Sequence, residues 1–290
     1  MKLSYLYSKI LEFGIDKDPR REKSKITAFA DSAVLYGSPE KEIRKIMVGI
    51  DIDTAELMLA DKFRQSKGLD LVISHHPQGA AYAGLHEVMR LQVDLLKEVG
   101  ISDKVARGLL DERMLEVERK ISSANHMRSV DAAALLDLAF MCVHTPADNH
   151  VWSYISELFA RNKPSNVAGV LEMLKAIPEY ALAEERQAGP KLVLGNPNRA
   201  CGKVLVDMTG GTEGSKEVFD KLYKCGIRTL VAMHLGEEHF KKAKESGLSV
   251  IVAGHISSDT LGLNLLLDRI EKIQKFSVIS CSGFTRYRRN

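Results

Sequence analysis

The feature that most constrains this fold is a short hydrophobic strand that ends in two adjacent histidines. Branched apolar residues between Gly68 and Pro77 predict a buried strand, and Ser74 leads from it into His75 and His76. Neighbouring strand side chains point to opposite faces, so the two histidines share one site only where the strand breaks. Pro77 favours such a break because it removes a ladder donor. Paired imidazoles at a strand end are typical of a metal-binding edge, and a polar loop without ligands is the alternative.

The same pattern occurs a second time, near the end of the chain. In residues 68–76 and again in 247–255, a glycine ends a helix and a hydrophobic strand follows. In both segments the eighth residue after the glycine is a histidine, His76 in the first and His255 in the second. We therefore expect two strands of one parallel sheet to carry His76 and His255 to the same carboxyl edge, where α/β proteins place their sites.

The surrounding sequence alternates between strands and helices. A strand at 45–50 is followed by a helix at about 54–66, with Asp53 or Thr54 as its cap, and then by the histidine strand; this βαβ unit implies a parallel pair. Residues 86–140 are helical in pattern. Further strands are expected at 140–143, 191–194, 203–207, 229–233, 249–253 and 276–280. Helices are expected at 2–13, 215–224, 237–245 and 259–270, and a helical region at about 151–176 is interrupted around Pro164. We predict an α/β fold, layered α/β/α, with a mostly parallel or mixed sheet.

Composition excludes several classes of protein. A net charge of +3 on 290 residues is too small to favour nucleic acid as a partner. No apolar run approaches the ~20 residues that span a bilayer, so we expect no membrane association. The first residues include Glu12 and are unlike a signal peptide. The cysteines Cys142, Cys201, Cys225 and Cys281 are dispersed, which favours reduced thiols and a cytoplasmic location.

Three strand ends supply side chains of the kind that bind metals. These are His75 and His76; His144 or Asp148, in a loop that Pro146 closes; and His255 with Asp259. A helix that begins near Ser257 would bring the last two together in its first turn. Imidazole and carboxylate ligands suit Zn, Fe, Mn or Ni, and the lack of a nearby cysteine argues against a structural zinc site. Five ligands with two carboxylates exceed the needs of one catalytic metal, so we expect two divalent ions.

In this order, these motifs resemble the dinuclear-metal family named after the NGG-interacting factor three. The resemblance rests on residues 71–77, on His144-Thr145 with Asp148, and on Gly254-His255 with an acid four residues later. It implies an interleaved second domain and a homohexamer with metal pairs facing an inner cavity. Some members are called type-two GTP cyclohydrolases. The ligands that the resemblance implies are His75, His76, Asp148, His255 and Asp259.

On this basis we expect residues 1–149 and 250–290 to form the metal-binding α/β domain, with a helical insertion at about 86–140. Residues 150–249 would form the second α/β domain, inserted between the two parts of the first. The chain departs from the family at Asp259, where a glutamate is usual, and at Asn149-His150, where glycines are usual. Within the long insertion, His126 either reaches over the metals as a lid or lies on an ordinary helix surface.

Two further clusters are weaker candidates. Residues 209–214 contain three glycines between a strand and a helix, which indicates either a tight turn or a phosphate-binding loop. His234 with Glu237, Glu238 and His239 is either a metal cluster or a solvated helix start.

The first functional hypothesis is a metal-dependent hydrolase that acts through a metal-activated hydroxide. Its substrate is an unidentified small molecule, and nucleotide-like molecules are among the candidates. His144 and His126 are its candidate catalytic residues, for proton transfer. The alternative is a non-enzymatic metal-binding oligomer for metal storage, delivery, sensing or scaffolding.

Overall fold

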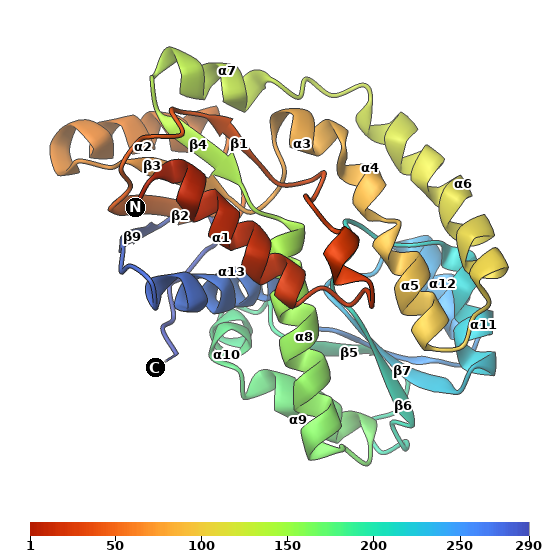
Figure 1. Cartoon of the computed structure of the whole chain (residues 1–290). Coiled ribbons are helices and arrows are strands. Elements are labelled where there is room, and N and C mark those ends of the chain that lie inside the picture. Colours follow the sequence, from red (N-terminus) through yellow and green to blue (C-terminus); the bar gives the residue numbers. More distant parts are fainter. Residues whose placement is uncertain (290) are drawn as a thin grey trace.

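The computed structural model describes residues 1–289 and contains two β-sheets, each between layers of helices (Figure 1). In spatial order, the first sheet contains β1 (Ala33–Tyr36), β4 (Ala139–Cys142), β3 (Leu71–Ser74), β2 (Lys45–Gly49) and β9 (Ser277–Ser280). The second contains β5 (Lys191–Leu194), β8 (Ser249–Val252), β7 (Ile227–Ala232) and β6 (Lys203–Asp207). Only β1–β4 and β5–β8 pair in antiparallel fashion. The predicted layered α/β/α class is therefore confirmed.

Alternate residues of each strand face different helices, so each sheet has a hydrophobic core on both faces. The first sheet is covered by α1 (Leu3–Asp16) and α13 (His255–Glu271) on one face, and by α2 (Thr54–Lys67) and α7 (Arg128–Leu135) on the other. The second sheet has α8 (Thr145–Asn162), α9 (Val167–Lys175) and α10 (Pro178–Glu185) on one face. Its other face carries α5 (Leu91–Glu98), α6 (Asp103–Ile121), α11 (Phe219–Lys224) and α12 (Glu237–Glu245).

Short elements complete the chain, and both of its ends lie on the same side of the molecule (Figure 1). They are α3 (Gly79–Ala83), α4 (Leu85–Val88) and the 3-10 turns η1 (Lys23–Lys25) and η2 (Lys216–Val218). No helix within residues 1–289 is both long and apolar enough to cross a bilayer. The division into interleaved domains stays a prediction.

The βαβ unit around the histidine strand forms as predicted. β2 and β3 are parallel, with Ile46 opposite Leu71 and Gly49 opposite Ser74. Asp53 caps α2 in a reciprocal capping box with Glu56, which satisfies backbone donors at the helix start. The unit thus fixes where β3 ends and the histidines begin.

Two helix boundaries differ from the expectation, each for a local reason. α1 runs through Gly14, which is not its stop: a Cβ there would lie 2.7 Å from Cβ of Pro146, so the glycine permits close packing against the start of α8. α13 begins at His255 rather than at 259, because the Gly254 backbone (φ 106°) turns the chain directly from β8 into the helix. Ser258 then lies inside the first turn and donates to the carbonyl of Gly254 at 2.6 Å.

The expectation that His76 and His255 come from one sheet is wrong. β3 lies in the first sheet and β8 in the second. The repeated pattern indicates that each strand is buried in a sheet covered by helices, but it does not indicate which sheet the strand joins. The helical region expected at 151–176 is interrupted around Pro164 as predicted, since α8 ends at Asn162 and α9 begins at Val167, but α8 already starts at Thr145. Asp148 therefore lies in the first turn of a helix rather than in a loop; Pro146 fits there because a first-turn residue needs no intrahelical N–H.

Candidate metal centre

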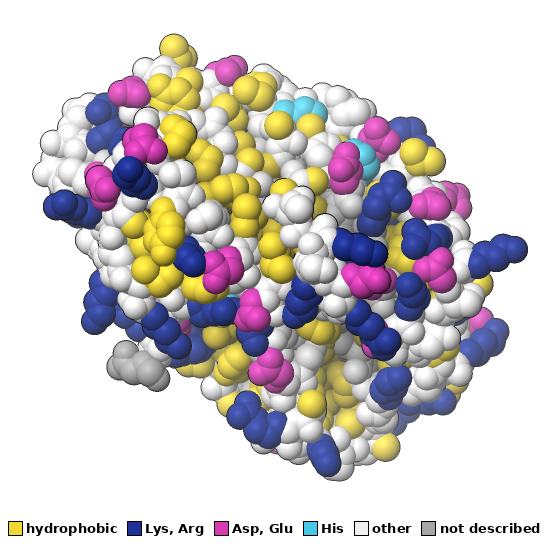
Figure 2. Space-filling view, in the orientation of Figure 1, with side chains coloured by type: hydrophobic (Ala, Val, Ile, Leu, Met, Phe, Trp, Pro, Cys, Tyr) yellow, Lys and Arg dark blue, Asp and Glu magenta, His cyan; other side chains and the backbone are white. Residues whose placement is uncertain are grey.

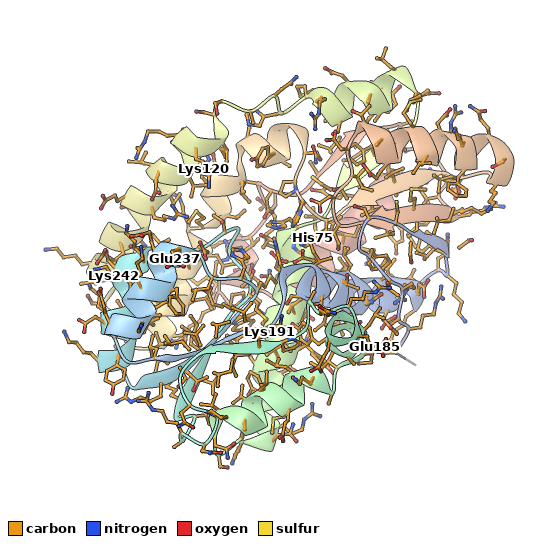
Figure 3. The ribbon with its side chains drawn as sticks, turned by 180° about the vertical axis from the view of Figure 1, so that it is seen from behind. His75, Lys120, Glu185, Lys191, Glu237 and Lys242 are labelled. Atoms are coloured by element: carbon orange, nitrogen blue, oxygen red, sulfur yellow. The ribbon has the colours of Figure 1, made fainter. Side chains whose placement is uncertain are left out.

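The carboxyl ends of β3 and β4 in the first sheet meet the end of β8 from the second. Four histidine rings gather there: the ring centroids of His75 and His144 are 4.8 Å apart, and those of His76 and His255 are 5.0 Å apart. Figure 3 shows His75 in the middle of the molecule, where the two halves face each other. The predicted ligands are thus close in space although they come from both sheets.

His75 is fully buried and has one ring nitrogen fixed by the backbone. Its Nδ1 donates to the carbonyl oxygen of Val143 at 3.0 Å, which leaves Nε2 with a free lone pair. Nε2 lies 3.4 Å from Oδ1 of Asp148 and 3.5 Å from Oδ1 of Asp259. An imidazole held in this tautomer is ready to bind a cation.

His76 and His255 face each other across the seam between the two sheets. Their Nε2 atoms are 3.4 Å apart. Nδ1 of His76 donates to the carboxylate of Asp51 at 2.6 Å, the carboxylate–histidine arrangement that orients metal-binding imidazoles. Asp51 is the first residue after the predicted strand at 45–50, and because β2 and β3 are parallel neighbours its side chain lies beside His76.

Asp259 divides its two carboxylate oxygens between these histidines. Oδ1 faces His75, while Oδ2 lies 3.4 Å from Nε2 of His76 and 3.7 Å from Nε2 of His255. The side chain is almost completely buried. One carboxylate therefore contacts both halves of the histidine cluster.

His144 is oriented by a second buried carboxylate. Its Nδ1 lies 2.7 Å from Oδ2 of Asp31, which also accepts a hydrogen bond from the hydroxyl of Thr145 at 2.6 Å. Nε2 of His144 points to Oδ2 of Asp148, at 3.7 Å. Sequence analysis missed the roles of Asp31 and Asp51, because neither is adjacent in sequence to the histidine that it orients.

The buried polar atoms of this cluster fit a cation. Within the described chain, Nε2 of His75, Oδ1 of Asp148 and both carboxylate oxygens of Asp259 are buried and have no hydrogen-bond partner. Unsatisfied buried groups are costly, so native proteins retain them where a ligand satisfies them. Two groups of ligand atoms are close enough to hold a metal ion: His75, His76 and Asp259; and His75, His144 and Asp148.

The electrostatics of the cluster also favour positive charge. Burial alone would lower the pKa of His75, but Asp259 and Asp148 outweigh it and raise this pKa to about 10. Burial likewise opposes protonation of His76, whereas Asp259 and Asp51 raise its pKa to about 9. Burial would raise the pKa of Asp259, yet His75, His76 and His255 lower it. The field that stabilises imidazolium here would equally stabilise a metal cation.

A cavity of about 530 Å³ opens beside the cluster. His76, His144 and His255 line it, together with Tyr82 of α3 and residues of the predicted helical insertion, among them Asn125, His126 and Arg128. His126 is not among the grouped ligand atoms; its Nε2 lies 3.0 Å from the carbonyl oxygen of Ile121 and its ring packs against Tyr82. It thus faces the cavity rather than the outer surface alone.

The glycine-rich segment 209–214 has a packing explanation. Gln92 of α5 donates to the carbonyl oxygens of Gly210 and Thr212 at 2.7 Å each. A Cβ on Gly210 would lie 2.7 Å from Gln92, and one on Gly211 would lie 2.8 Å from Val88. The glycines are therefore needed where the loop meets α4 and α5, which favours the tight-turn interpretation over a phosphate loop.

His234 belongs to this edge of the second sheet rather than to a cluster with Glu237 and Glu238. Its Nδ1 lies 3.4 Å from Oε1 of Glu213, and its ring centroid is 4.8 Å from that of His255. His239 contacts the other oxygen of Glu213, at 3.6 Å. Among the described residues, these side chains do not form a group of ligand atoms close enough for a metal.

Comparisons with known proteins agree with this architecture, although no known family model matches the chain. A "GTP cyclohydrolase 1 type 2 homolog" of Halobacterium salinarum is 22% identical over 248 residues, which cover 84% of this chain and 88% of the relative. The crystal structure of a NIF3 superfamily protein from Sphaerobacter thermophilus is 28% identical, with a TM-score of 0.79 over 96% of this chain and 98% of that one. Reduced HcgD from Methanocaldococcus jannaschii, 17% identical, covers 97% of both chains with a TM-score of 0.55 and shows the same fold.

The fold and the cluster define an α/β protein with histidine and aspartate side chains that could hold a metal ion between two sheets. Within that class, the sequence and structural matches confirm the resemblance to the NIF3-like family.

Proposed function

We propose that the cluster binds two divalent metal ions and that the protein is a metal-dependent hydrolase acting on a small substrate. The observation that carries the proposal is the carboxylate of Asp259, whose two oxygens face different histidines. A carboxylate placed in this way could be shared by two metal ions. The shorter aspartate suffices because α13 begins at His255 and brings its backbone close.

Because His75 belongs to both groups of close ligand atoms, we assign it to the set that contains Asp148, and both sets share Asp259. His75, His144 and Asp148 would hold one ion with Oδ1 of Asp259; His76 and His255 would hold the other with Oδ2. We assign His144 to the ligands instead of to proton transfer, because Asp31 fixes it as Asp51 fixes His76. Imidazole and carboxylate donors suit Zn, Fe, Mn or Ni.

Bound ions of this kind supply Lewis acidity and lower the pKa of coordinated water. The chain itself contributes a polar cavity that opens on His76, His144 and His255 and has room for a small molecule. His126 faces this cavity, and with Nε2 directed at the carbonyl of Ile121 its Nδ1 is the nitrogen left for a substrate hydrogen bond or a proton. A substrate would lie between the histidine cluster and the wall formed by Tyr82, Asn125 and Arg128.

Metal content per chain tests the ligand assignment. We expect two ions in wild type, fewer in His75→Ala and Asp259→Asn, and two in the control His239→Ala, whose histidine lies outside both ligand sets. A single ion in wild type that Asp259→Asn leaves unchanged would refute the bridging role.

Turnover tests the reaction class. Bis(4-nitrophenyl) phosphate, 4-nitrophenyl acetate and GTP serve as probes, and we expect the wild type to hydrolyse at least one of them. His75→Ala should lose this activity. Wild type from which a chelator has removed the metal should also lose it and should regain it when metal is added. Two bound ions without turnover of any probe would favour the non-enzymatic alternative of storage, delivery, sensing or scaffolding. The homohexamer and the cytoplasmic location stay predictions, and sedimentation analysis would measure the first.

A further inference from the structure

Away from the metal centre, the edge of the second sheet is open. β6 is the last strand in the order β5-β8-β7-β6 and pairs with β7 alone. Within residues 1–289, the main chain of Lys203–Asp207 makes no hydrogen bond beyond that ladder. An edge strand presents a row of N–H and C=O groups to which another extended chain can pair.

This edge forms the floor of an apolar groove of about 650 Å³. The helical layers on the two faces of the sheet form its walls, with Trp152 and Phe159 of α8 on one side and Leu95 of α5 on the other. Figure 2 shows hydrophobic side chains in a hollow in the lower part of the molecule, with many Lys and Arg side chains around it. The groove thus combines unpaired main-chain groups with hydrophobic walls.

The shape of the groove selects a single extended segment. The edge of β6 lies between two helical layers, so a partner must enter between α5 and α8 to reach it. A second copy of the chain has the same two walls beside its own β6, so strand pairing between copies would have to accommodate four helical walls. A flexible segment without helices beside it meets no such obstacle.

The charge around the groove selects an acidic segment. Lys163 at the end of α8 and Lys203 at the start of β6 have no ion-pair partner among the described residues. Of the two cations that line the groove itself, Arg21 is neutralised by Glu98 at 2.5 Å, and within residues 1–289 Lys163 is the one left free. The charge that remains free is positive, and complementary charge steers and orients a partner.

We propose that this groove binds an extended acidic segment of a partner protein, which adds a strand to the edge of β6. Main-chain hydrogen bonds to Lys203–Asp207 supply the pairing over about 17 Å, the length of five extended residues. Apolar side chains at alternate positions pack between Trp152 and Leu95, and an acidic side chain faces Lys163. The site is separate from the metal cluster and does not depend on it.

The chain's single tryptophan provides a direct readout, because Trp152 lines the groove. The probe is the synthetic peptide acetyl-Glu-Val-Glu-Val-Glu-Val-Glu-amide, titrated into the full-length protein. We expect a saturable change in Trp152 emission. No change up to about 1 mM peptide, a concentration that detects even weak binding, would overturn the proposal.

Two variant peptides test strand addition and charge separately. Methylation of alternate backbone nitrogens removes donors that pair with β6 and should weaken binding at least about tenfold; equal affinity would overturn strand addition. A peptide with lysine in place of glutamate should also bind more weakly, and equal affinity would overturn the acidic assignment.

Matched protein variants locate the binding. Lys163→Glu should weaken the acidic peptide about three- to fivefold, whereas Lys275→Glu, the same change at an exposed lysine after α13, should leave it unchanged. Equal effects of the two would overturn the proposal. Sedimentation with and without peptide tests whether a second copy of the chain occupies the groove instead. If the peptide dissociated an assembly of the chain, the groove would be an interface between copies and the proposal would fail.

Discussion

Replacing Gly262 with alanine would test the helix packing on which the metal centre depends. Gly262 lies in α13, three residues after Asp259, where α13 packs against α8. A Cβ at this position would stand 2.6 Å from the carbonyl oxygen of Ala147, the residue before Asp148. Because ordinary contact begins at 3.4 Å, the two helices must separate locally by about 0.8 Å.

The size of the effect follows from two opposing contributions. Alanine stabilises a helix by about 1 kcal/mol relative to glycine. Overpacking a rigid contact costs about 1–3 kcal/mol. Gly262→Ala should therefore change the free energy of unfolding by about 0–2 kcal/mol in the destabilising direction. Gly108→Ala in α6 is the matched control, because a Cβ there has no neighbour within 4 Å and should stabilise by about 1 kcal/mol.

Urea denaturation of both variants measures this difference from the midpoints, provided that the slopes are unchanged. Competition with a chelator measures metal affinity, which we expect to fall about tenfold or more in Gly262→Ala, since metal coordination tolerates displacements of only about 0.2 Å. If Gly262→Ala stabilised the protein as much as Gly108→Ala does, the packing argument would be wrong. If Gly262→Ala lost stability but kept its metal affinity, the contact between α13 and α8 would contribute to stability without fixing the positions of the ligands.

Three further predictions concern charged side chains. Asp31→Asn and Asp51→Asn should each weaken metal binding about 10–100-fold by releasing His144 and His76, as measured by chelator competition; unchanged affinity would remove their orienting role. Burial raises the pKa of Asp207 to about 6, with Glu213 adding to the shift and His234 opposing it, so the folded state binds the proton more tightly than the unfolded state does. The contribution of this carboxyl group to stability should then be fully present below about pH 4 and be lost, by about 3 kcal/mol, as pH rises through about 6. The difference in urea midpoint between wild type and Asp207→Asn should change with pH over this range by a corresponding amount. Arg286→Ala should destabilise by about 2–4 kcal/mol, because it leaves Asp268 and Glu271 without their buried partner, whereas Lys25→Ala at an exposed pair should cost less than about 1 kcal/mol.

Local patterns in the sequence predicted most of the elements correctly. The strand and helix that precede His75 follow from apolar periodicity, the Asp53 cap and Gly68, all of which act within a few residues. α10 was not expected, since its charged, weakly periodic sequence is helical through contacts such as that of Tyr180 with Ser258. Gly14 was taken as a helix stop because its partner, Pro146, is distant in the sequence.

The sequence predicted which residues belong to the candidate site more accurately than it predicted how the two sheets bring them together. Strand ends and ligand chemistry identified the histidines and aspartates that lie together, but periodicity carries no information about which sheet a strand joins. The expected single sheet was therefore wrong, although His76 and His255 do meet. Likewise, the run of basic residues at 286–289 gives no local sign that the side chain of Arg286 is buried against Asp268 and Glu271.

The contact between His76 and His255 joins residues 179 positions apart in the chain. During synthesis, the first histidine pair leaves the ribosome long before α13 exists, so the complete cluster forms only once residue 259 has emerged and both sheets have docked. A nascent chain can offer an ion only part of the ligand set. If the cluster binds metal as proposed, the complete site can form only late, and a chain truncated before α13 would keep its first histidines and still lack the site.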